Sequence, residues 1–268
     1  MRLFIEVITS LLRPVKRRLG LQRKLLLIWH RQNPESWLDQ NLRTGVLRMP
    51  DAPRYKAIEA IAAKINASGP QPLWKGYREV YESDNTVPLS QLPLERMPDQ
   101  VRTQPEMGRL FSWLAERRRP DLIVEIGTAF GVSARYWAEG LKAASAGRLL
   151  TFDPNEIWHG IASSHLKDYD GIVEAKLGTF EDSIDECMKP GEKIDIAFVD
   201  AIHTSEFVSR QVEMLVKRLA SDGFILLDDI SFSHDMTRCW ERWARDPRVL
   251  ASVAVANRVG ILEFRPAT

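Results

Sequence analysis

The sequence predicts an α/β protein built on a doubly wound, mostly parallel sheet. From about residue 103 onward, apolar segments of strand length alternate with amphipathic segments of helix length, which is typical of a parallel sheet covered by helices. Several of these strands end in a carboxylate, and the first runs through a glycine-bearing turn directly into a helix. Ligands bind beyond the carboxyl ends of such strands, so these residues are candidates for a site.

A strand, a glycine turn and a helix in direct succession form the most informative segment. The sequence predicts the strand over residues 122–126, the turn over 127–131 and the helix from 132 or 133 to 141. Gly127 and Gly131 allow a sharp turn and leave room for a ligand against the main chain, although they could serve the turn alone. Their Gly-x-x-x-Gly spacing departs from the Gly-x-Gly-x-x-Gly pattern of dinucleotide sites, which argues against an ordinary NAD site.

The elements on either side of this segment agree with it. Residues 103–116 predict a short loop and an amphipathic helix. Residues 148–153 predict a second strand that ends in Asp153, 26 residues after Gly127. A carboxylate there can accept hydrogen bonds from both hydroxyls of a ribose, so Asp153 is a candidate ribose ligand. The alternative is that Asp153 ends the strand only because aspartate favours turns.

The third and fourth strands bring further polar residues to the same edge. Residues 172–177 predict the third strand, and Thr179 and Phe180 follow in its turn. The fourth strand, over 194–200, is nearly continuous in apolar residues, as expected when both of its faces are covered. It ends at Asp200, and His203 lies three residues further on.

The remaining elements are a long helix, a fifth strand and a hairpin. We expect the helix over residues 205–219 and the strand over 224–229, ending at Asp228 and Asp229. Apolar runs at 249–256 and 259–264, joined by Asn257 and Arg258, predict a terminal antiparallel hairpin. Before the hairpin, Trp240 and Trp243 share one face of a further helix, where they either line a pocket or fill the core.

The first strand and its turn resemble the first motif of a known enzyme class. The chain has the pattern Glu-x-Gly-Thr-x-x-Gly-x-Ser at Glu125, Gly127, Thr128, Gly131 and Ser133. This pattern resembles the class I S-adenosylmethionine-dependent methyltransferases, and more closely their O-methyltransferase branch, over about the last 165 residues. The resemblance implies a Rossmann-like methyltransferase fold with seven strands, the terminal hairpin included. It also implies S-adenosylmethionine as cofactor, with the motif on its methionine portion, Asp153 on its ribose, and Thr179 and Phe180 at its adenine.

His203 and Asp200 are the candidate catalytic residues. The Asp-x-x-His pattern resembles one found in bacterial enzymes that modify sugars and natural products. A neutral imidazole, with an unperturbed pKa of ~6.5, can take a proton from a hydroxyl as its oxygen attacks the methyl group. The alternatives for His203 are a hydrogen-bonded surface histidine and a cap of the following helix.

Activation by a metal ion is the second hypothesis for catalysis. Asp200, Asp228 and Asp229 could together offer hard oxygen ligands to Mg²⁺, which would lower the pKa of a bound hydroxyl. The cation-dependent O-methyltransferases place aspartates after the fourth and fifth strands in this manner. This chain departs from their usual pattern, because it has Ala201 and Ile202 after Asp200 and Asp-Asp in place of Asp-Asn. Metal dependence therefore stays open.

The predicted function is S-adenosylmethionine-dependent transfer of a methyl group to a hydroxyl of a small molecule or glycan. Two alternatives are kept. One is an NAD-type sugar-modifying oxidoreductase on a similar sheet, against which the glycine spacing and the terminal hairpin count. The other is a catalytically silent methyltransferase fold that serves as a binding module.

The N-terminal region differs in charge from the rest of the chain. Residues 1–31 carry eight basic side chains against Glu6 alone, a formal charge of +7, whereas the whole chain carries +1. Their apolar residues recur at three and four, which predicts a basic amphipathic helix or pair of helices that could lie on an anionic membrane surface, on a partner or on its own domain. Neither apolar run reaches the ~20 residues that span a bilayer, and no signal-peptide cleavage site follows. The near-neutral total gives no general case for nucleic acid.

We therefore expect two regions: residues 1–100 as a helical N-terminal extension and substrate-facing cap, and residues 101–268 as the cofactor-binding domain. A helix is predicted over 55–65, and a proline-rich stretch after it carries aromatic side chains that could stack on a planar acceptor, namely Trp74, Tyr77 and Tyr81. Cys187 and Cys239 are far apart and lack metal-ligand spacing, which favours a cytoplasmic protein, peripheral at most to the inner face of a membrane. Assembly into a homo-oligomer stays open.

Overall fold

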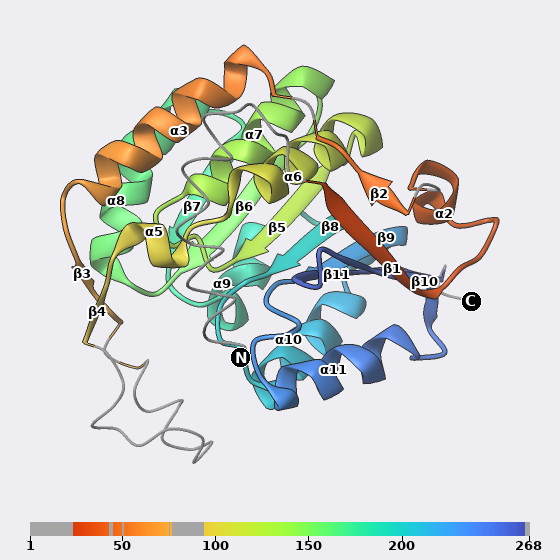
Figure 1. Cartoon of the computed structure of the whole chain (residues 1–268). Coiled ribbons are helices and arrows are strands. Elements are labelled where there is room, and N and C mark those ends of the chain that lie inside the picture. Colours follow the sequence, from red (N-terminus) through yellow and green to blue (C-terminus); the bar gives the residue numbers. More distant parts are fainter. Residues whose placement is uncertain (1–23, 43–44, 50, 75, 77–93, 266–268) are drawn as a thin grey trace, which may run out of the picture.

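One nine-stranded sheet forms the centre of the computed structural model, which describes residues 24–42, 45–49, 51–74, 76 and 94–265 (Figure 1). The strand order is β2-β1-β10-β11-β9-β8-β5-β6-β7. The strand bounds are β1 Leu25–Arg31, β2 Val46–Leu47, β5 Leu122–Ile126, β6 Arg148–Asp153, β7 Val173–Leu177, β8 Ile194–Val199, β9 Leu219–Leu227, β10 Val249–Val255 and β11 Val259–Phe264. Strands β5 to β9 pair in parallel, and the others add antiparallel.

The seven strands β5 to β11 confirm the predicted parallel sheet and its terminal hairpin. The two further strands come from the N-terminal region and correct one expectation. Residues 25–31 form β1 instead of continuing a basic helix, because their main chain pairs with the edge of β10, with Leu27 opposite Val255. Side chains in β1 alternate accordingly: Leu25 and Leu27 are buried, whereas Leu26 is exposed. The remainder of the predicted basic helix, residues 1–23, lies outside the described residues.

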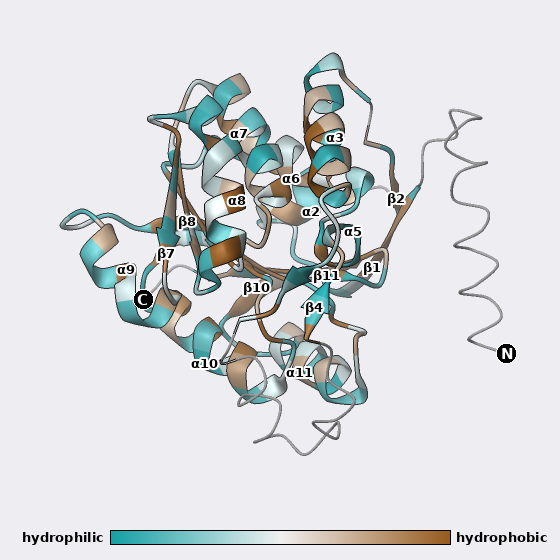
Figure 2. Cartoon of the chain, turned by 90° about the vertical axis from the view of Figure 1, so that its left-hand side faces the viewer, coloured by the Kyte–Doolittle hydropathy of each residue, from teal (hydrophilic) through white to brown (hydrophobic). Residues whose placement is uncertain are grey.

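Helices cover both faces of the sheet (Figure 2). On one face lie α6 (Pro105–Arg118), α7 (Val132–Ala144) and α8 (Glu156–Leu166), and on the other α9 (Phe180–Cys187), α10 (Ser205–Val216) and α11 (His234–Ala244). The residues of β5 divide between the two cores: Ile123 packs with α6 and α7, whereas Leu122, Val124 and Ile126 pack with α9 and α10. Both faces of β5 are therefore covered by helices.

The structure corrects the predicted boundary between α10 and β9 and decides where one pair of tryptophans lies. Helix α10 ends at Val216, not at residue 219, because Leu219 already pairs with Ile194 as the first residue of β9. Trp240 and Trp243 of α11 are both buried in the core between that helix and the sheet, and neither lines the cavity described below.

The N-terminal region also supplies a cover for the parallel half of the sheet. Helix α3 (Pro53–Asn66), which confirms the helix predicted at 55–65, packs on α7 through Tyr55, Ile58 and Ala62. The strands β3 (Gln71–Pro72) and β4 (Glu95–Arg96) form a small separate pair, and α5 (Pro98–Val101) leads from it to α6. Helix α2 (Trp37–Asn41) lies beyond β1 at the other end of the sheet. Of the predicted aromatic side chains of the cap, Trp74 is described, whereas Tyr77 and Tyr81 lie outside the described residues.

Among the described residues, none of the helices has the length and apolar character needed to cross a bilayer.

Candidate active site

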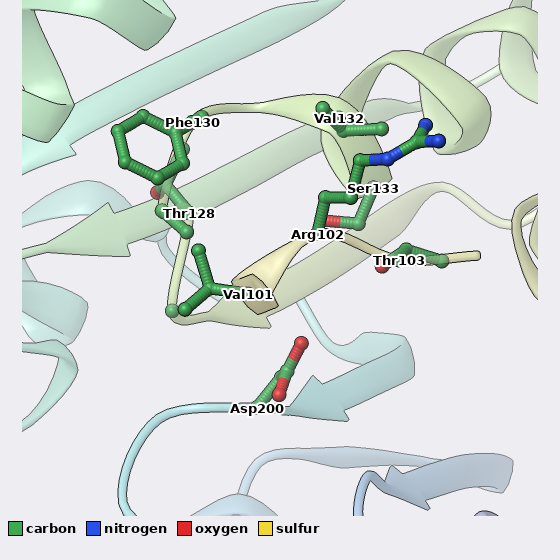
Figure 3. Close-up of a pocket in the computed structure, with 10 residues that line it drawn as sticks. Val101, Arg102, Thr103, Thr128, Phe130, Val132, Ser133 and Asp200 are labelled. Atoms are coloured by element: carbon green, nitrogen blue, oxygen red, sulfur yellow. The ribbon is translucent and has the colours of Figure 1, made fainter. Parts of the chain in front are cut away.

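A cavity of about 730 Å³ opens at the carboxyl edge of the parallel strands. Loops that follow β5, β6, β7, β8 and β9 all contribute to its wall, and Trp74 and Arg96 close it from the N-terminal region. This volume lies in the range of small-molecule sites. A narrower pocket adjoins it where α5 meets the glycine turn, and Figure 3 shows Asp200 opposite Val101 and Thr128 there.

The glycine turn is held by main-chain contacts. Gly127 has a φ of +101°, and a Cβ there would lie 2.1 Å from the carbonyl oxygen of Asp200. The glycine is therefore required because the turn packs on the end of β8, and its main chain also lines both pockets. Gly131, with φ +73°, begins α7 without a side-chain cap, so the first N–H groups of that helix face the narrow pocket.

Glu125 is fully buried beside this turn. Its Oε2 accepts a hydrogen bond from the Thr151 hydroxyl at 2.6 Å, and that hydroxyl also shares a 2.6 Å hydrogen bond with Thr128. Within the described part of the chain, its Oε1 has no hydrogen-bond partner. Burial raises the pKa of Glu125 to about 7, although the hydroxyls of Thr151 and Ser133 oppose this effect. A buried carboxyl oxygen without a hydrogen-bond partner is typical of a group that awaits a donor.

Asp153 lies at the end of β6 with both oxygens directed by backbone donors. The Ala129 N–H donates to Oδ2 at 2.7 Å and the Asn155 N–H donates to Oδ1 at 2.8 Å. Each carboxylate oxygen keeps a further lone pair, and Asp153 lines the large cavity, so both oxygens can still accept from a ligand. Burial raises the pKa of Asp153 to about 6, against these two N–H groups.

The two adenine candidates differ in what they can offer. Thr179 caps α9: its hydroxyl donates to Asp182 at 2.6 Å and accepts from the Asp182 N–H at 3.3 Å. Phe180 is fully buried and meets Phe152 edge-on at 5.9 Å. Both line the cavity, but Thr179 is occupied by its own helix.

Sequence reasoning missed a polar pair beside these candidates. Gln211 of α10 donates from Nε2 to Glu181 at 3.1 Å, which directs its Oε1 away from that carboxylate. Gln211 is fully buried and lines the cavity, and among the described residues its Oε1 has no partner. The two residues are thirty positions apart on different helices, and no local pattern marks either.

His203 lies between two carboxylates, as the strand ends predicted. Its Nε2 is 3.6 Å from Oδ2 of Asp229 and 3.8 Å from Oδ1 of Asp200. These distances exceed those of hydrogen bonds but allow electrostatic attraction. On another side, the imidazole packs against the ring of Phe232 at 5.4 Å between centroids. Thr204, and not His203, provides the side-chain cap of α10.

Arg258 contacts two of the three candidate metal ligands, Asp228 and Asp229. Arg258 donates from Nε to Oδ1 of Asp228 at 3.1 Å and from Nη2 to Oδ2 at 2.8 Å, and its Nε is 3.5 Å from Oδ1 of Asp229. Both oxygens of Asp228 are thus engaged, and in the described part of the chain no three His, Cys, Asp or Glu residues are grouped as metal ligands. A Mg²⁺ ion held by Asp200, Asp228 and Asp229 would lie beside this guanidinium, so the positive charge of Arg258 disfavours the expected metal site.

Burial and the charges of this cluster shift the pKa values of its members. Burial and the charge of Asp228 raise the pKa of Asp200 well above its usual range, and Arg258 opposes them. Burial and Asp228 also raise the pKa of Asp229, against the positive charges of Arg258 and His203. Burial disfavours the charge of Arg258, but Asp228 and Asp229 outweigh it and raise the pKa of the guanidinium.

The chain is similar to known methyltransferases. A family profile described as a methyltransferase domain matches residues 124–230. The O-methyltransferase ankF of Aspergillus thermomutatus is 31% identical over 129 residues, which cover 47% of this chain and 52% of that protein, so the match spans about half of that relative.

Solved structures share the fold. An O-methyltransferase from Bacillus cereus in complex with SAH has a TM-score of 0.57 and 22% identity, covering 85% of this chain and 95% of that one. The O-methyltransferase TomG from Streptomyces achromogenes in complex with SAM has a TM-score of 0.53 and 21% identity, covering 73% and 100%. At these identities the likeness shows the fold.

Proposed function

We propose that residues 124–230, which match the profile of a methyltransferase domain, form a class I S-adenosylmethionine-dependent methyltransferase domain, and that the chain transfers a methyl group to a hydroxyl of a small molecule. The observation that carries the proposal is the meeting of three features at one cavity: the glycine turn, the ribose-type carboxylate Asp153, and a histidine beside two carboxylates. Neither an oxidoreductase nor a silent binding module gains support from the comparisons.

The cofactor-binding residues are proposed from vacant hydrogen-bonding positions. Asp153 would accept from the two ribose hydroxyls, because each of its oxygens retains a lone pair. The free N–H groups at the start of α7 suit the carboxylate of the methionine portion, since a helix N-terminus attracts anions. Glu125, with its unpaired Oε1, suits the amino group of that portion together with Thr128 and Ser133 around it.

At the proposed adenine end, Gln211 and Glu181 are better candidates than Thr179. The unpaired Oε1 of Gln211 and the carboxylate of Glu181 are acceptors, which an exocyclic amino group can satisfy. Phe180 remains a candidate for contact with the base, whereas Thr179 serves mainly as the cap of α9.

S-adenosylmethionine, when bound, supplies a methyl group on a sulfonium centre. The protein must place the acceptor oxygen in line with that group and remove its proton. His203 is the proposed base, with Asp229 and Asp200 on either side of its Nε2 to stabilise the charge that the ring acquires with the proton. Asp200 is thus a positioning residue as well as part of the wall.

The acceptor side of the cavity is mainly apolar. Phe207 in the first turn of α10 and Phe232, which packs on His203, line the cavity, and Trp74 lines it from the N-terminal region. Such a wall suits a planar or apolar small molecule better than a hydrated glycan. We retain residues 1–100 as the proposed cap and extension; contact of residues 1–31 with a membrane or partner, and homo-oligomerisation, remain predictions.

Calorimetric titration with S-adenosylmethionine and, separately, with NAD tests the proposal. We expect micromolar binding of S-adenosylmethionine alone, and a loss of about 10-fold to 100-fold in affinity for Asp153→Ala, because two charge-assisted hydrogen bonds are removed. Asp222→Ala, which changes an exposed aspartate far from the cavity, is the control. Binding of NAD alone, or of neither ligand, would reject the methyltransferase assignment.

A further inference from the structure

The tip of the β10–β11 hairpin is fastened to the loop that follows β9. Ala256 and Asn257 both have a φ of +53°, which makes the turn tight and places Arg258 at the start of β11. The carbonyl of Asn257 accepts from the Ser231 hydroxyl at 2.7 Å, and the carbonyl of Arg258 accepts from the Ile230 N–H at 3.0 Å. The hairpin therefore presents the guanidinium of Arg258 in a fixed position against the carboxylates of that loop.

The guanidinium forms a two-pronged contact with a carboxylate that needs a counter-charge. Asp228 is only 4% exposed, and Arg258 binds both of its oxygens, at 3.1 and 2.8 Å. A buried carboxylate without such a partner would be strongly unfavourable. The planar fork of arginine fits a carboxylate with two parallel hydrogen bonds, which a single point charge cannot reproduce.

The same guanidinium reaches the proposed base through one further residue. Its Nε is 3.5 Å from Oδ1 of Asp229, and the other oxygen of Asp229 is 3.6 Å from Nε2 of His203. Asp229 also has a φ of +50°, a backbone conformation that the surrounding structure has to maintain. Arg258 on one side and His203 on the other thus fix the orientation of this carboxylate.

A divalent cation at this edge would need several converging oxygens with free lone pairs. Arg258 already donates to both oxygens of Asp228, and it brings its own positive charge next to them. Two cations would therefore compete for the same carboxylates.

We propose that Arg258 is the resident cation of this site: it takes the place that a divalent metal ion would need, holds Asp228 and Asp229, and through Asp229 positions His203, so that catalysis requires no metal. The role of Arg258 in positioning His203 rests on the proposed methyl transfer. The exclusion of a divalent metal ion does not. Arg258 is a positioning residue, because it acts on the acceptor through Asp229 and His203.

The first experiment measures Mn²⁺ binding to the full chain by electron paramagnetic resonance and needs no acceptor. Wild type should leave the spectrum of free Mn²⁺ unchanged up to roughly 1 mM, whereas Arg258→Ala should bind the ion, because its carboxylates lose their counter-charge. Arg248→Ala is the matched control, since Arg248 also spans two carboxylates, Glu213 and Asp246, but lies outside the cavity. Binding of Mn²⁺ by wild type at micromolar concentrations would overturn the proposal.

The second experiment measures turnover with an acceptor found by screening, after treatment with EDTA. Wild type should keep its full rate, and Arg258→Ala should lose about 10-fold to 100-fold in kcat with little change in affinity for S-adenosylmethionine. Added guanidinium ion should restore part of the kcat lost in Arg258→Ala. Arg258→Lys should keep a lower kcat than wild type, because a single ammonium group cannot form both hydrogen bonds of the guanidinium. An EDTA-sensitive wild type that Mg²⁺ reactivates, or an unchanged kcat in Arg258→Ala, contradicts the inference. Failure of S-adenosylmethionine to bind would instead reject the proposed function and leave the Mn²⁺ result standing.

Discussion

Glu125 shows how one side chain can link the cofactor turn to the pH dependence of the fold. It is fully buried, and burial raises its pKa to about 7. A carboxyl whose pKa is raised on folding favours the folded state below its unfolded pKa, and this contribution is lost as the pH rises through the folded value. The protein should therefore become less stable between mildly acidic and mildly alkaline pH.

Glu125→Gln removes this titration and tests the argument. Relative to the variant, wild type should lose roughly 2 kcal/mol of unfolding free energy between about pH 5.5 and pH 8, measured by urea denaturation without cofactor. Glu35→Gln, at an exposed position, should follow wild type at both pH values. Parallel curves for Glu125→Gln and wild type would mean that the carboxyl is ionised throughout.

His203 is the residue on which turnover should depend most. We expect His203→Ala to lower kcat by about 10²-fold to 10⁴-fold, the usual contribution of a general base, with the dissociation constant for S-adenosylmethionine nearly unchanged. His159→Ala is a suitable control, because His159 lies on α8 outside the residues that line the cavity. Full activity without the imidazole would remove His203 from the mechanism.

At the scale of elements, one buried carboxylate of the sheet binds the start of helix α2 in the N-terminal region. Glu263 of β11 is 2% exposed, and its oxygens accept from the Ser36 hydroxyl at 2.6 Å and from the Trp37 and Leu38 N–H groups at 2.9 Å each. These are the orphan donors at the start of α2. The short helix therefore depends on a side chain more than two hundred residues away in the sequence.

Removal of this carboxylate should loosen the N-terminal region. Glu263→Ala leaves three donors without their acceptor, and we expect it to lower the free energy of unfolding by roughly 2–4 kcal/mol. Glu241→Ala breaks only a surface ion pair with Arg245 at 3.5 Å and should cost well under about 1 kcal/mol. Equal midpoints of urea unfolding for the two variants would show that α2 docks by its apolar contacts alone.

At the scale of the whole molecule, the parallel sheet could be predicted because its signals are local. The bounds of β5, β6 and β11 match the expected ones, since each strand is a short apolar run between turn residues. Strand β1 could not be recognised, because Leu25–Arg31 gains its conformation from the exposed edge of β10, far away in the sequence. The hydrophobic pattern of a short segment does not show which distant strand the segment will pair with.

The site also contains residues that the sequence predicted and residues that it did not. Asp153, Asp200 and His203 could be found because the carboxyl ends of parallel strands meet at one edge. The Gln211–Glu181 pair and the Arg258–Asp228 contact depend on which helix and which hairpin tip reach that edge, and no spacing encodes this. The metal hypothesis stays a prediction: the sequence showed three aspartates at strand ends, but it did not show that Arg258 of the hairpin contacts Asp228 and Asp229.

The close approach of Gly127 to the Asp200 carbonyl has a consequence for how such an enzyme could change its substrate. This main-chain joint connects the turn proposed for the methyl donor with the strand end that leads to the proposed base. Their relative alignment is set by backbone, not by any exchangeable side chain. New acceptors can therefore be accommodated by altering side chains of the wall such as Phe207 or Trp74, while the main-chain alignment of donor turn and strand end is kept.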